Sequence, residues 1–248
     1  MQKVELLAVP DLPLVKAGDD LARLIGEKLA GELALRPGDV VVLAQKIVSK
    51  AEGRMVDLAT VTPSQRAVDL AEEVLKDPRL VELILSESTR VVRSRPNVLI
   101  VEHKLGLIMA NAGIDQSNVA PQDGVERALL LPRDPDASAE ALRARLGATA
   151  VLIIDSFGRP WRKGTTGVAI GAAGLPSFID MRGQTDMFGR VLQVTMPAFA
   201  DEIAAAASLV MGQAAEALPV VIVRGLSWSA PSTPARDLIR ASGEDLFR

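Results

Sequence analysis

Three short, strongly apolar runs constrain the fold of this chain more than any other feature. They are VVVLAQ (40–45), AVLIIDS (150–156) and PVVIVRG (219–225). The first has no alternation of apolar and polar residues, which is typical of a strand covered on both faces of its sheet. Helical and strand patterns mix along the chain without a regular strand–helix rhythm. We therefore expect an α+β fold rather than a doubly wound parallel sheet.

Apolar residues spaced three or four positions apart predict the helices. The first helix begins at Asp19 or Asp20, either of which can serve as its N-cap. Its apolar face comprises Leu21, Leu24, Ile25 and Leu29. The other predicted elements are one or two helices within 63–88 that Pro78 interrupts, two strands within 97–115 with a turn near Lys104–Gly106, and a helix over 198–217.

The size of the chain bounds its organisation. With 248 residues, 48% of them hydrophobic, it can bury a core as one large domain or as two lobes. We treat 1–248 as a single domain. The polar stretch 132–148 is the best candidate for a boundary between lobes.

Composition excludes several classes of protein. A net charge of −3 lacks the basic footprint that nucleic-acid binding needs. The absence of cysteine excludes disulfides, thiolate zinc sites and a cysteine nucleophile. No apolar run approaches the roughly 20 residues that cross a bilayer, and the N-terminus does not resemble a signal peptide. We expect a soluble, cytoplasmic protein that acts on small molecules, with no nucleic-acid or membrane partner.

Two segments place oxygen-bearing side chains at the exits of predicted strands. Asp115 and Asn118 lie in NAGIDQSNVAP, and Asp155 and Ser156 end the run at 150–156. Carboxylate, hydroxyl and amide oxygens are ligands that Mg²⁺ and Mn²⁺ favour. Either aspartate alone is more often a turn or a cap at a strand end. The occurrence of two such pairs is what favours a metal site.

If the chain binds phosphate, it must do so with individual basic side chains rather than with a standard glycine-rich loop. The sequence contains neither G-x-x-x-x-G-K-[ST] nor a G-x-G-x-x-G that follows a strand and opens a helix. Lys46 and Lys50 lie at the exit of the strand 40–45, where they could direct two ammonium groups at a polyphosphate. Such a pair is more often a solvated face.

Two further features have simple structural explanations. Gly212 and Gln213 interrupt the predicted helix at 198–217, and close helix packing at the glycine would account for them. The single histidine, His103, could be a general base, although an isolated histidine near a hairpin is more often structural.

Long sequence blocks in a fixed order resemble one family. They are LPLVKAGDDL, GDVVVLAQKIVSKAEG, GLIMANAGIDQSNV, IIDSFGRPWRKGTTGVAIG, LVMGQAAEALPVVIVRG and PARDLIR with EDLF. Together they are similar to the coenzyme F(420)-0:L-glutamate ligases, also called γ-glutamyl ligases. The resemblance runs nearly end to end, and an ordered series of blocks is more specific than any single motif.

The resemblance implies a GTP-dependent ligase that attaches L-glutamate through γ-linked amide bonds to the lactyl-phosphate tail of the deazaflavin F(420)-0. It implies an F(420) ligase-like α+β fold in two lobes, whose subunits intertwine as a homodimer. It also implies two divalent cations per subunit, Mg²⁺ or Mn²⁺, with K⁺ as a further candidate. The preference for GTP over ATP comes from the resemblance alone.

Carried over by motif, the resemblance also implies roles for individual residues. Asp115 and Asp155 would hold the first metal ion, and Ser156 and Gln213 the second. Many members have threonine where this chain has Ser156, whose hydroxyl can serve in the same way. Asp115, Asp155 and Lys50 would form the catalytic group. The nucleotide would contact Leu12, Pro13, Leu14, Val15, Gln45, Lys46, Lys50, Asn118, Met211, Gly212, Gln213, Ala214, Ala215, Glu216, Ala217 and Leu218.

The implied chemistry suits these residues. A carboxylate must be activated before an amine can displace an oxygen from it, and transfer of a γ-phosphoryl group achieves this through an acyl phosphate. That transfer depends on positioning and on neutralising phosphate charge. Arg159, Arg162 and Lys163 are expected to meet an anionic substrate. Two alternatives stay open: a ligase of the same mechanism for another acceptor, such as a folate-like acid, and a non-catalytic nucleotide-binding regulator.

Overall fold

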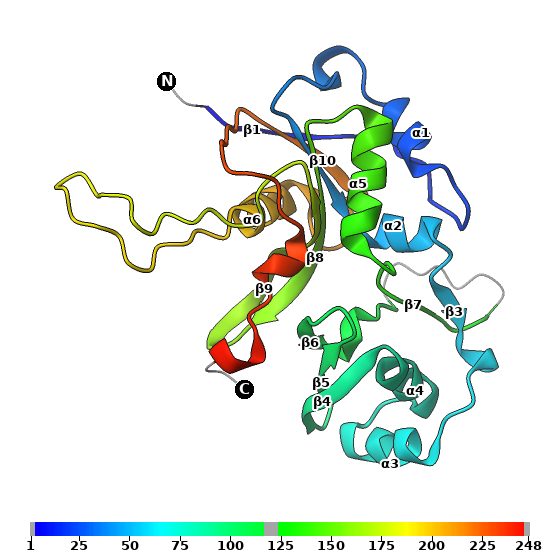
Figure 1. The fold of residues 1–248 in the computed structure, drawn as a ribbon. Coiled ribbons are helices and arrows are strands. Elements are labelled where there is room, and N and C mark those ends of the chain that lie inside the picture. The colour runs from blue at the N-terminus through cyan, green and yellow to red at the C-terminus, as the bar shows by residue number, and fades with distance from the viewer. Residues whose placement is uncertain (1–2, 117–123, 246–248) are drawn as a thin grey trace.

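The computed structural model describes residues 3–116 and 124–245, and its largest element is a five-stranded mixed sheet (Figure 1). In spatial order its strands are β1 (Glu5–Ala8), β10 (Val220–Arg224), β2 (Val40–Ala44), β8 (Ala150–Arg159) and β9 (Arg162–Ala173). Among these described strands, β2 and β8 alone run parallel. The three apolar runs of the sequence therefore form three adjacent strands.

Helices cover both faces of this sheet. On one face lie α1 (Leu21–Gly26), α2 (Gln45–Ala51) and α5 (Pro135–Leu146), and on the other lies α6 (Phe199–Met211). Side chains alternate along β2, so that Val41 and Leu43 join the core beneath the three helices, whereas Val40 and Val42 join the core beneath α6. All four are fully buried. The prediction of a strand covered on both faces is confirmed.

Residues 55–130 form a second part with a hydrophobic core of its own, drawn below the main sheet in Figure 1. Its elements are β3 (Met55–Asp57) paired with β7 (Arg127–Leu129), helices α3 (Gln65–Val74) and α4 (Pro78–Ser86), and a sheet of β4 (Ser88–Arg95), β5 (Val98–His103) and β6 (Ile108–Ala110). Pro78 is the first residue of α4, so it separates two helices as predicted. The mixture of mainly antiparallel sheets with helices confirms the α+β class.

Some elements differ in extent from the predictions. The Asp20 carboxylate accepts from the Arg23 N–H at 3.0 Å and caps the first helix, which ends already at Gly26. The last helix ends at Met211, because Gly212 adopts a positive φ of 72°. Short 3₁₀ helices occupy Gly31–Leu33 (η1), Leu58–Thr60 (η2), Asn111–Gly113 (η3), Ala235–Leu238 (η4) and Ser242–Glu244 (η5).

Helix α5 lies within the predicted boundary segment, 132–148. It packs on β8 and β9 and contributes Ala139 and Leu142 to the core of the main sheet. The division into two lobes, and its boundary, stay predictions.

Two glycines of β9 allow helices to approach the sheet closely. A Cβ atom at Gly171 would lie 2.3 Å from the carbonyl oxygen of Pro135, at the start of α5. One at Gly167 would lie 2.4 Å from the carbonyl oxygen of Ala204 in α6. Packed interiors do not tolerate such overlaps, so a side chain here would displace a helix.

Gly171→Ala is expected to lower the free energy of unfolding by about 1–3 kcal/mol, because the backbone of α5 would have to move. Urea denaturation measures this change. Gly158→Ala is the matched control in the neighbouring strand, since an added Cβ there has no atom within 4 Å; it should change stability by about 0.5 kcal/mol or less. Equal losses in the two variants would contradict the close-approach explanation.

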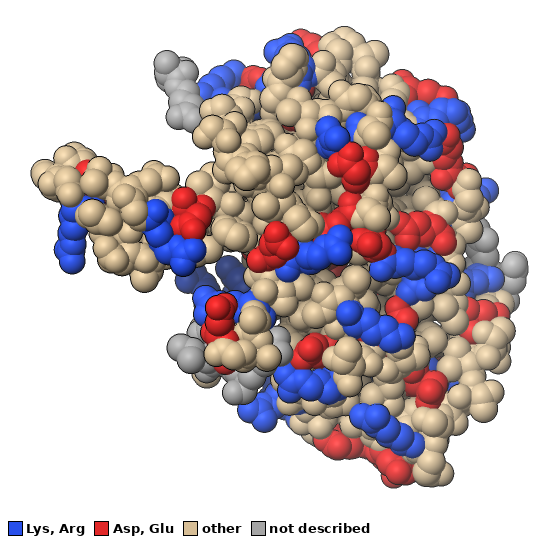
Figure 2. All heavy atoms as spheres, in the orientation of Figure 1, with Lys and Arg blue, Asp and Glu red and all other residues tan. Residues whose placement is uncertain are grey.

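A long arm, residues 178–197, stands away from the rest of the chain (Figures 1 and 2). Its two sides are joined by backbone hydrogen bonds, such as that from the Met181 N–H to the Thr195 carbonyl at 3.1 Å. At its tip, Met187 and Phe188 are 88% and 87% exposed. Large apolar side chains exposed in this way are typical of a surface that meets another molecule.

None of the helices in the described part combines the length and the hydropathy that crossing a bilayer requires. Cytoplasmic location stays a prediction.

Candidate active site

One end of the five-stranded sheet gathers the predicted site segments. Because β2 and β8 are parallel, their carboxyl ends lie together, with Ala44 paired to Ile154. The Val9 N–H, just after β1, donates to the Val220 carbonyl at 2.9 Å, and the Ala44 N–H donates to the Pro219 carbonyl at 2.9 Å. The segments that leave β1, β2 and β8 and the one that enters β10 therefore meet. Crevices outside the carboxyl ends of strands are common ligand sites.

The two predicted lysines lie on a helix. The strand that was predicted over 40–45 ends at Ala44, and the chain turns directly into α2, so a strand does not position Lys50. Lys46 and Lys50 are four residues apart and so share one face of α2. Gln45 is 1% exposed, and its Oε1 accepts from the Ser49 hydroxyl at 2.8 Å. A contact of Gln45 with nucleotide stays a prediction.

Asp115 is fixed by its backbone to the end of β7. Its N–H donates to the Leu129 carbonyl at 3.0 Å, and its carbonyl accepts from the Leu129 N–H at 2.8 Å. Its carboxylate Oδ2 lies 2.5 Å from Lys46 Nζ. This ion pair joins the second part of the chain to α2 and brings Asp115 to the carboxyl end of the main sheet.

Asp155 lies where β8 extends beyond β2. It pairs with Val168 of β9, and the Ser156 N–H donates to its Oδ1 at 2.8 Å. Burial above all, and then the nearby Asp115 carboxylate, raise the pKa of Asp155 to about 6, against the lowering effects of the Ser156 hydrogen bond and Lys46. The charged form of Asp155 is therefore disfavoured, mainly because the carboxyl group is withdrawn from water.

Lys50 belongs to the same electrostatic cluster. Burial and the charge of Lys46 lower the pKa of Lys50, whereas Asp115 acts in the opposite direction. The charges of Lys46 and Asp115 thus act on both Lys50 and Asp155. Carboxylates suit a hard cation and ammonium groups suit phosphate oxygens, so the cluster can serve both parts of a metal–polyphosphate complex.

The residues present fit a divalent cation that shares its coordination with a substrate. Across residues 3–116 and 124–245, no group of three or more His, Cys, Asp or Glu side chains is arranged to hold a metal ion. A cation between Asp115 and Asp155 would need further oxygens, which phosphates supply in many enzymes. The raised pKa of Asp155 supports the fit, because a cation would favour its ionised form.

Ser156 and Gln213, the second predicted pair, lie towards the other face of the sheet. Successive side chains on a strand point to opposite faces, so Ser156 is directed towards α6 when Asp155 is directed towards α2. Gly167, the partner of Ser156 in β9, packs against Ala204 of α6. Gln213 follows the end of α6 and is exposed. A metal ion shared by Ser156 and Gln213 stays a prediction.

The loop after β1 contains one group of predicted nucleotide contacts, Leu12–Val15. The Gly18 N–H donates to the Ala51 carbonyl at 2.9 Å, which fastens this loop to α2. Leu14 is 87% exposed, whereas Val15 is buried. The loop is therefore next to the lysine-bearing helix and presents an apolar side chain to solvent.

The loop before β10 contains the other group. Glu216 folds back over this loop, and its carboxylate accepts from the Ala214 N–H at 2.8 Å. The predicted contacts in the segment are Met211, Gly212, Gln213, Ala214, Ala215, Glu216, Ala217 and Leu218. Their contact with nucleotide stays a prediction, and Asn118 lies outside the described residues.

His103 fits the structural interpretation. It is 4% exposed at the end of β5, and its Nδ1 accepts from the Leu105 N–H at 2.9 Å. Burial lowers its pKa. The neutral ring helps to form the turn between β5 and β6.

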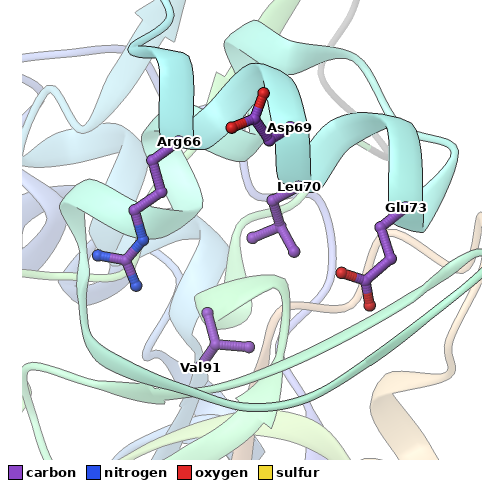
Figure 3. A pocket seen from close by; sticks show the side chains of 5 residues that line it. All are labelled: Arg66, Asp69, Leu70, Glu73 and Val91. Atoms are coloured by element: carbon purple, nitrogen blue, oxygen red, sulfur yellow. The ribbon is translucent and has the colours of Figure 1, made fainter.

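Two hollows lie outside the predicted site residues. One, of about 490 Å³, is open and lies between α3 and β4, where it is lined by Arg66, Asp69, Leu70, Glu73 and Val91 (Figure 3). The other, of about 240 Å³, lies beside β9. Sequence patterns did not indicate the hollow beside β9, because four segments that are far apart in the chain form its walls.

Comparisons with known proteins identify the family. The family described as F(420)-0:Gamma-glutamyl ligase matches residues 11–225. A coenzyme F(420):L-glutamate ligase of Methanothermobacter thermautotrophicus is 48% identical over 253 residues, which cover 99% of both chains. Proteins of the same name from Methanopyrus kandleri and Methanocaldococcus jannaschii are 45% and 39% identical, over 98% and 100% of this chain and 98% of each relative. This chain belongs to the F(420)-0:gamma-glutamyl ligase family, as its motifs predicted.

Proposed function

We propose that this chain is a GTP-dependent ligase that joins L-glutamate to coenzyme F(420)-0 through γ-linked amide bonds. The cluster of Lys46, Lys50, Asp115 and Asp155 is the observation that carries the proposal. Two carboxylates beside two lysines suit a nucleoside triphosphate with its cations. Relatives that match along the whole chain are named for L-glutamate ligation to coenzyme F(420).

In the proposed reaction, the acceptor carboxylate attacks the γ-phosphorus of GTP, and GDP leaves. The glutamate amine then attacks the resulting acyl phosphate, loses a proton and expels inorganic phosphate. Lys46 and Lys50 orient the phosphate chain and offset its charge. Asp115 and Asp155 are held by backbone hydrogen bonds and by β8, so they act as fixed ligands.

Two Mg²⁺ or Mn²⁺ ions, one on Asp115 and Asp155 and one on Ser156 and Gln213, would supply positive charge to the transferred phosphoryl group. K⁺ is a further candidate cation in the same proposal.

The β8–β9 hairpin carries the three cations that we assign to the anionic acceptor. Arg159 pairs with Arg162 at the turn, and Lys163 follows. All three are exposed, and they lie along the strand pair that contains Asp155. Because the acceptor carries a phosphodiester, cations close to Asp155 would help to orient it.

Incubation with GTP, Mn²⁺, L-glutamate and a panel of acceptors, followed by mass spectrometry, tests the function. We expect F(420)-0 to gain the mass of one or more glutamyl units, with release of GDP. Addition to a folate-like acid but not to F(420)-0 would assign a different acceptor. Binding of GTP with no product from any acceptor would favour a nucleotide-binding regulator.

Lys50→Ala is expected to weaken GTP binding by about 1.5–3 kcal/mol, the range for a hydrogen bond to a charged group. Isothermal titration calorimetry in the presence of Mn²⁺ measures the change. Lys28→Ala is the control. Lys28 is half-buried and lies just after α1, so this variant should bind GTP as the unmodified chain does. Unchanged affinity in correctly folded Lys50→Ala would remove Lys50 from the nucleotide site.

We also propose that two copies of the chain assemble as an intertwined homodimer. The arm at 178–197 supports this, because its exposed tip would be shielded from water by a second copy. Leu209 of α6 is 81% exposed and is a further apolar side chain that a second copy could cover.

Light scattering at micromolar concentration is expected to give about twice the 26.3 kDa chain mass. The double change Met187→Ser and Phe188→Ser should shift the equilibrium towards monomer, since it removes apolar surface from the arm. Leu75→Ser, which alters an exposed leucine on the second part of the chain, should leave the mass unchanged. A fully active monomer would contradict the assembly.

A further inference from the structure

The cavity of about 240 Å³ lies beside β9, next to the position that pairs with Asp155. Its walls are the turn between β5 and β6, the start of α5, part of β9 and the 3₁₀ helix η4. Asp155 pairs with Val168, and the cavity wall in β9 begins at the next residue, Ala169. Ile170 of that wall packs in the same core as Ile153, and Asp155 points to the same face because it lies two residues beyond Ile153.

The charges around this cavity are not balanced. Lys104, Arg133 and Arg236 line it together with Asp134 and Asp136. Asp136 is already satisfied, since two backbone N–H groups donate to its Oδ1 at 2.9 and 2.7 Å and Arg236 Nε donates to its Oδ2 at 3.0 Å. The charge of Arg236 is thus offset by Asp136 within the cavity wall. Figure 2 shows charged groups of both signs over this face, between α5 and β6.

Lys104 shares its acidic partner, Glu87, with Arg54, and the pair that Lys104 makes is the longer one. Lys104 Nζ lies 3.8 Å from a Glu87 carboxylate oxygen, and Arg54 already holds that carboxylate at 2.5 Å. The backbone N–H of Arg133 donates to Glu52 at 3.2 Å. Within the described residues, the Arg133 guanidinium makes no hydrogen bond or ion pair. Two cations, from two different walls, are therefore available to a ligand.

We propose that this cavity binds the incoming dicarboxylic amino acid, with Lys104 and Arg133 each holding one carboxylate. The proposal rests on the ligase function and gives its amino-acid substrate a place. The volume corresponds to roughly eight water molecules at about 30 Å³ each, which suits a molecule of glutamate's size. Sites for larger ligands occupy roughly 300–1,000 Å³. Leu105, Leu107 and Ile170 supply apolar wall for the methylene groups.

The position explains how the amine would meet the activated acceptor. Two carboxylate contacts fix the ends of the amino acid and leave its amine unbound by a cation. Since Ala169 in the cavity wall directly follows Val168, the residue that pairs with Asp155, the amine would have a short path to an acyl phosphate formed there.

Steady-state kinetics of Arg133→Gln and Lys104→Gln tests the assignment. Each variant should raise KM for glutamate about 10- to 100-fold, the loss expected when a charge-assisted hydrogen bond is removed. KM for GTP and for the acceptor, and kcat at saturating glutamate, should stay within about twofold. Arg66→Gln is the matched control, because Arg66 is an exposed arginine that lines the other hollow (Figure 3); all its constants should be unchanged.

A binding measurement separates this inference from the proposed function. Saturation-transfer NMR can detect glutamate bound to the full chain in the presence of Mg²⁺, which is diamagnetic, and a non-hydrolysable GTP analogue, without turnover. Loss of the signal in Arg133→Gln but not in Arg66→Gln supports the cavity even if no acceptor is ligated. Absence of glutamate binding to the unmodified chain, equal binding by all variants, or a raised KM for GTP or the acceptor in place of glutamate would overturn it.

Discussion

Asp155→Asn is expected to remove ligation, with kcat lowered by about 100-fold or more at saturating GTP and Mn²⁺. Asparagine keeps the size of the side chain and one oxygen donor, but it removes the charge that would hold a cation beside the phosphates. The variant should fold normally without metal, since burial already makes the Asp155 charge unfavourable and raises its pKa to about 6. Product formation followed by mass spectrometry and Mn²⁺ affinity from calorimetry measure the two effects.

Asp115→Asn should behave like Asp155→Asn, and the double variant should be little worse than either one. Residues that hold one ion act as a unit, so their losses do not add. Asp69→Asn on the exposed side of α3 is the control and should keep full activity. Near-normal turnover of Asp155→Asn at ordinary Mg²⁺ or Mn²⁺ concentrations would require the metal assignment to be abandoned.

Arg224→Met is expected to lower the free energy of unfolding by about 3–5 kcal/mol, because it leaves a buried carboxylate without its partner. Arg224 Nη2 lies 2.8 Å from Asp39 Oδ2, and the two side chains are 9% and 1% exposed. The same guanidinium donates to the carbonyls of Glu32 and Ala34 at 3.1 and 2.9 Å. Urea denaturation of the unmodified chain and of Arg224→Met, monitored by circular dichroism, measures the loss.

Two further variants test the cause of that loss. Arg182→Met breaks an ion pair with Asp180 whose side chains are 55% and 41% exposed, and it should cost about 1 kcal/mol or less. Adding Asp39→Leu to Arg224→Met removes the orphaned carboxylate and should restore part of the stability. If Arg224→Met cost no more than Arg182→Met, the buried pair would not be the reason for the loss.

The central strands could be predicted from the sequence because their composition leaves few alternatives. Valine, isoleucine and leucine make up most of β10 and β2, and the structure buries them on both faces. Helix α2 could not be predicted in the same way, since it follows β2 without any turn signal. Strand β4, STRVVRSR, was missed because arginines occupy positions where a half-buried strand usually has apolar residues. Strand β9 was obscured by its glycines, which serve helix packing.

The candidate site could be predicted as a set of residue types but not as an arrangement. Asp115 and Asp155 were identified from their places after apolar runs and from the family motifs. The ion pair between Asp115 and Lys46 depends on how the second part of the chain meets α2, and no local pattern carries that information. Lys104 and Arg133 had no signal either, because each lies in a segment that looks like an ordinary turn or helix start.

Asp155 and Ser156 are neighbours on β8, so their side chains lie on opposite faces of the sheet. This arrangement links ligand binding to the stability of both faces. Among the described residues, the core beneath α2 and the core beneath α6 are two separate clusters on opposite faces of the sheet. A ligand that contacts both side chains would bind to the two faces of the sheet at the same time. Binding of this ligand would then raise the temperature at which the helices on both faces unfold. The reason is that a ligand that binds only the folded chain stabilises it by mass action.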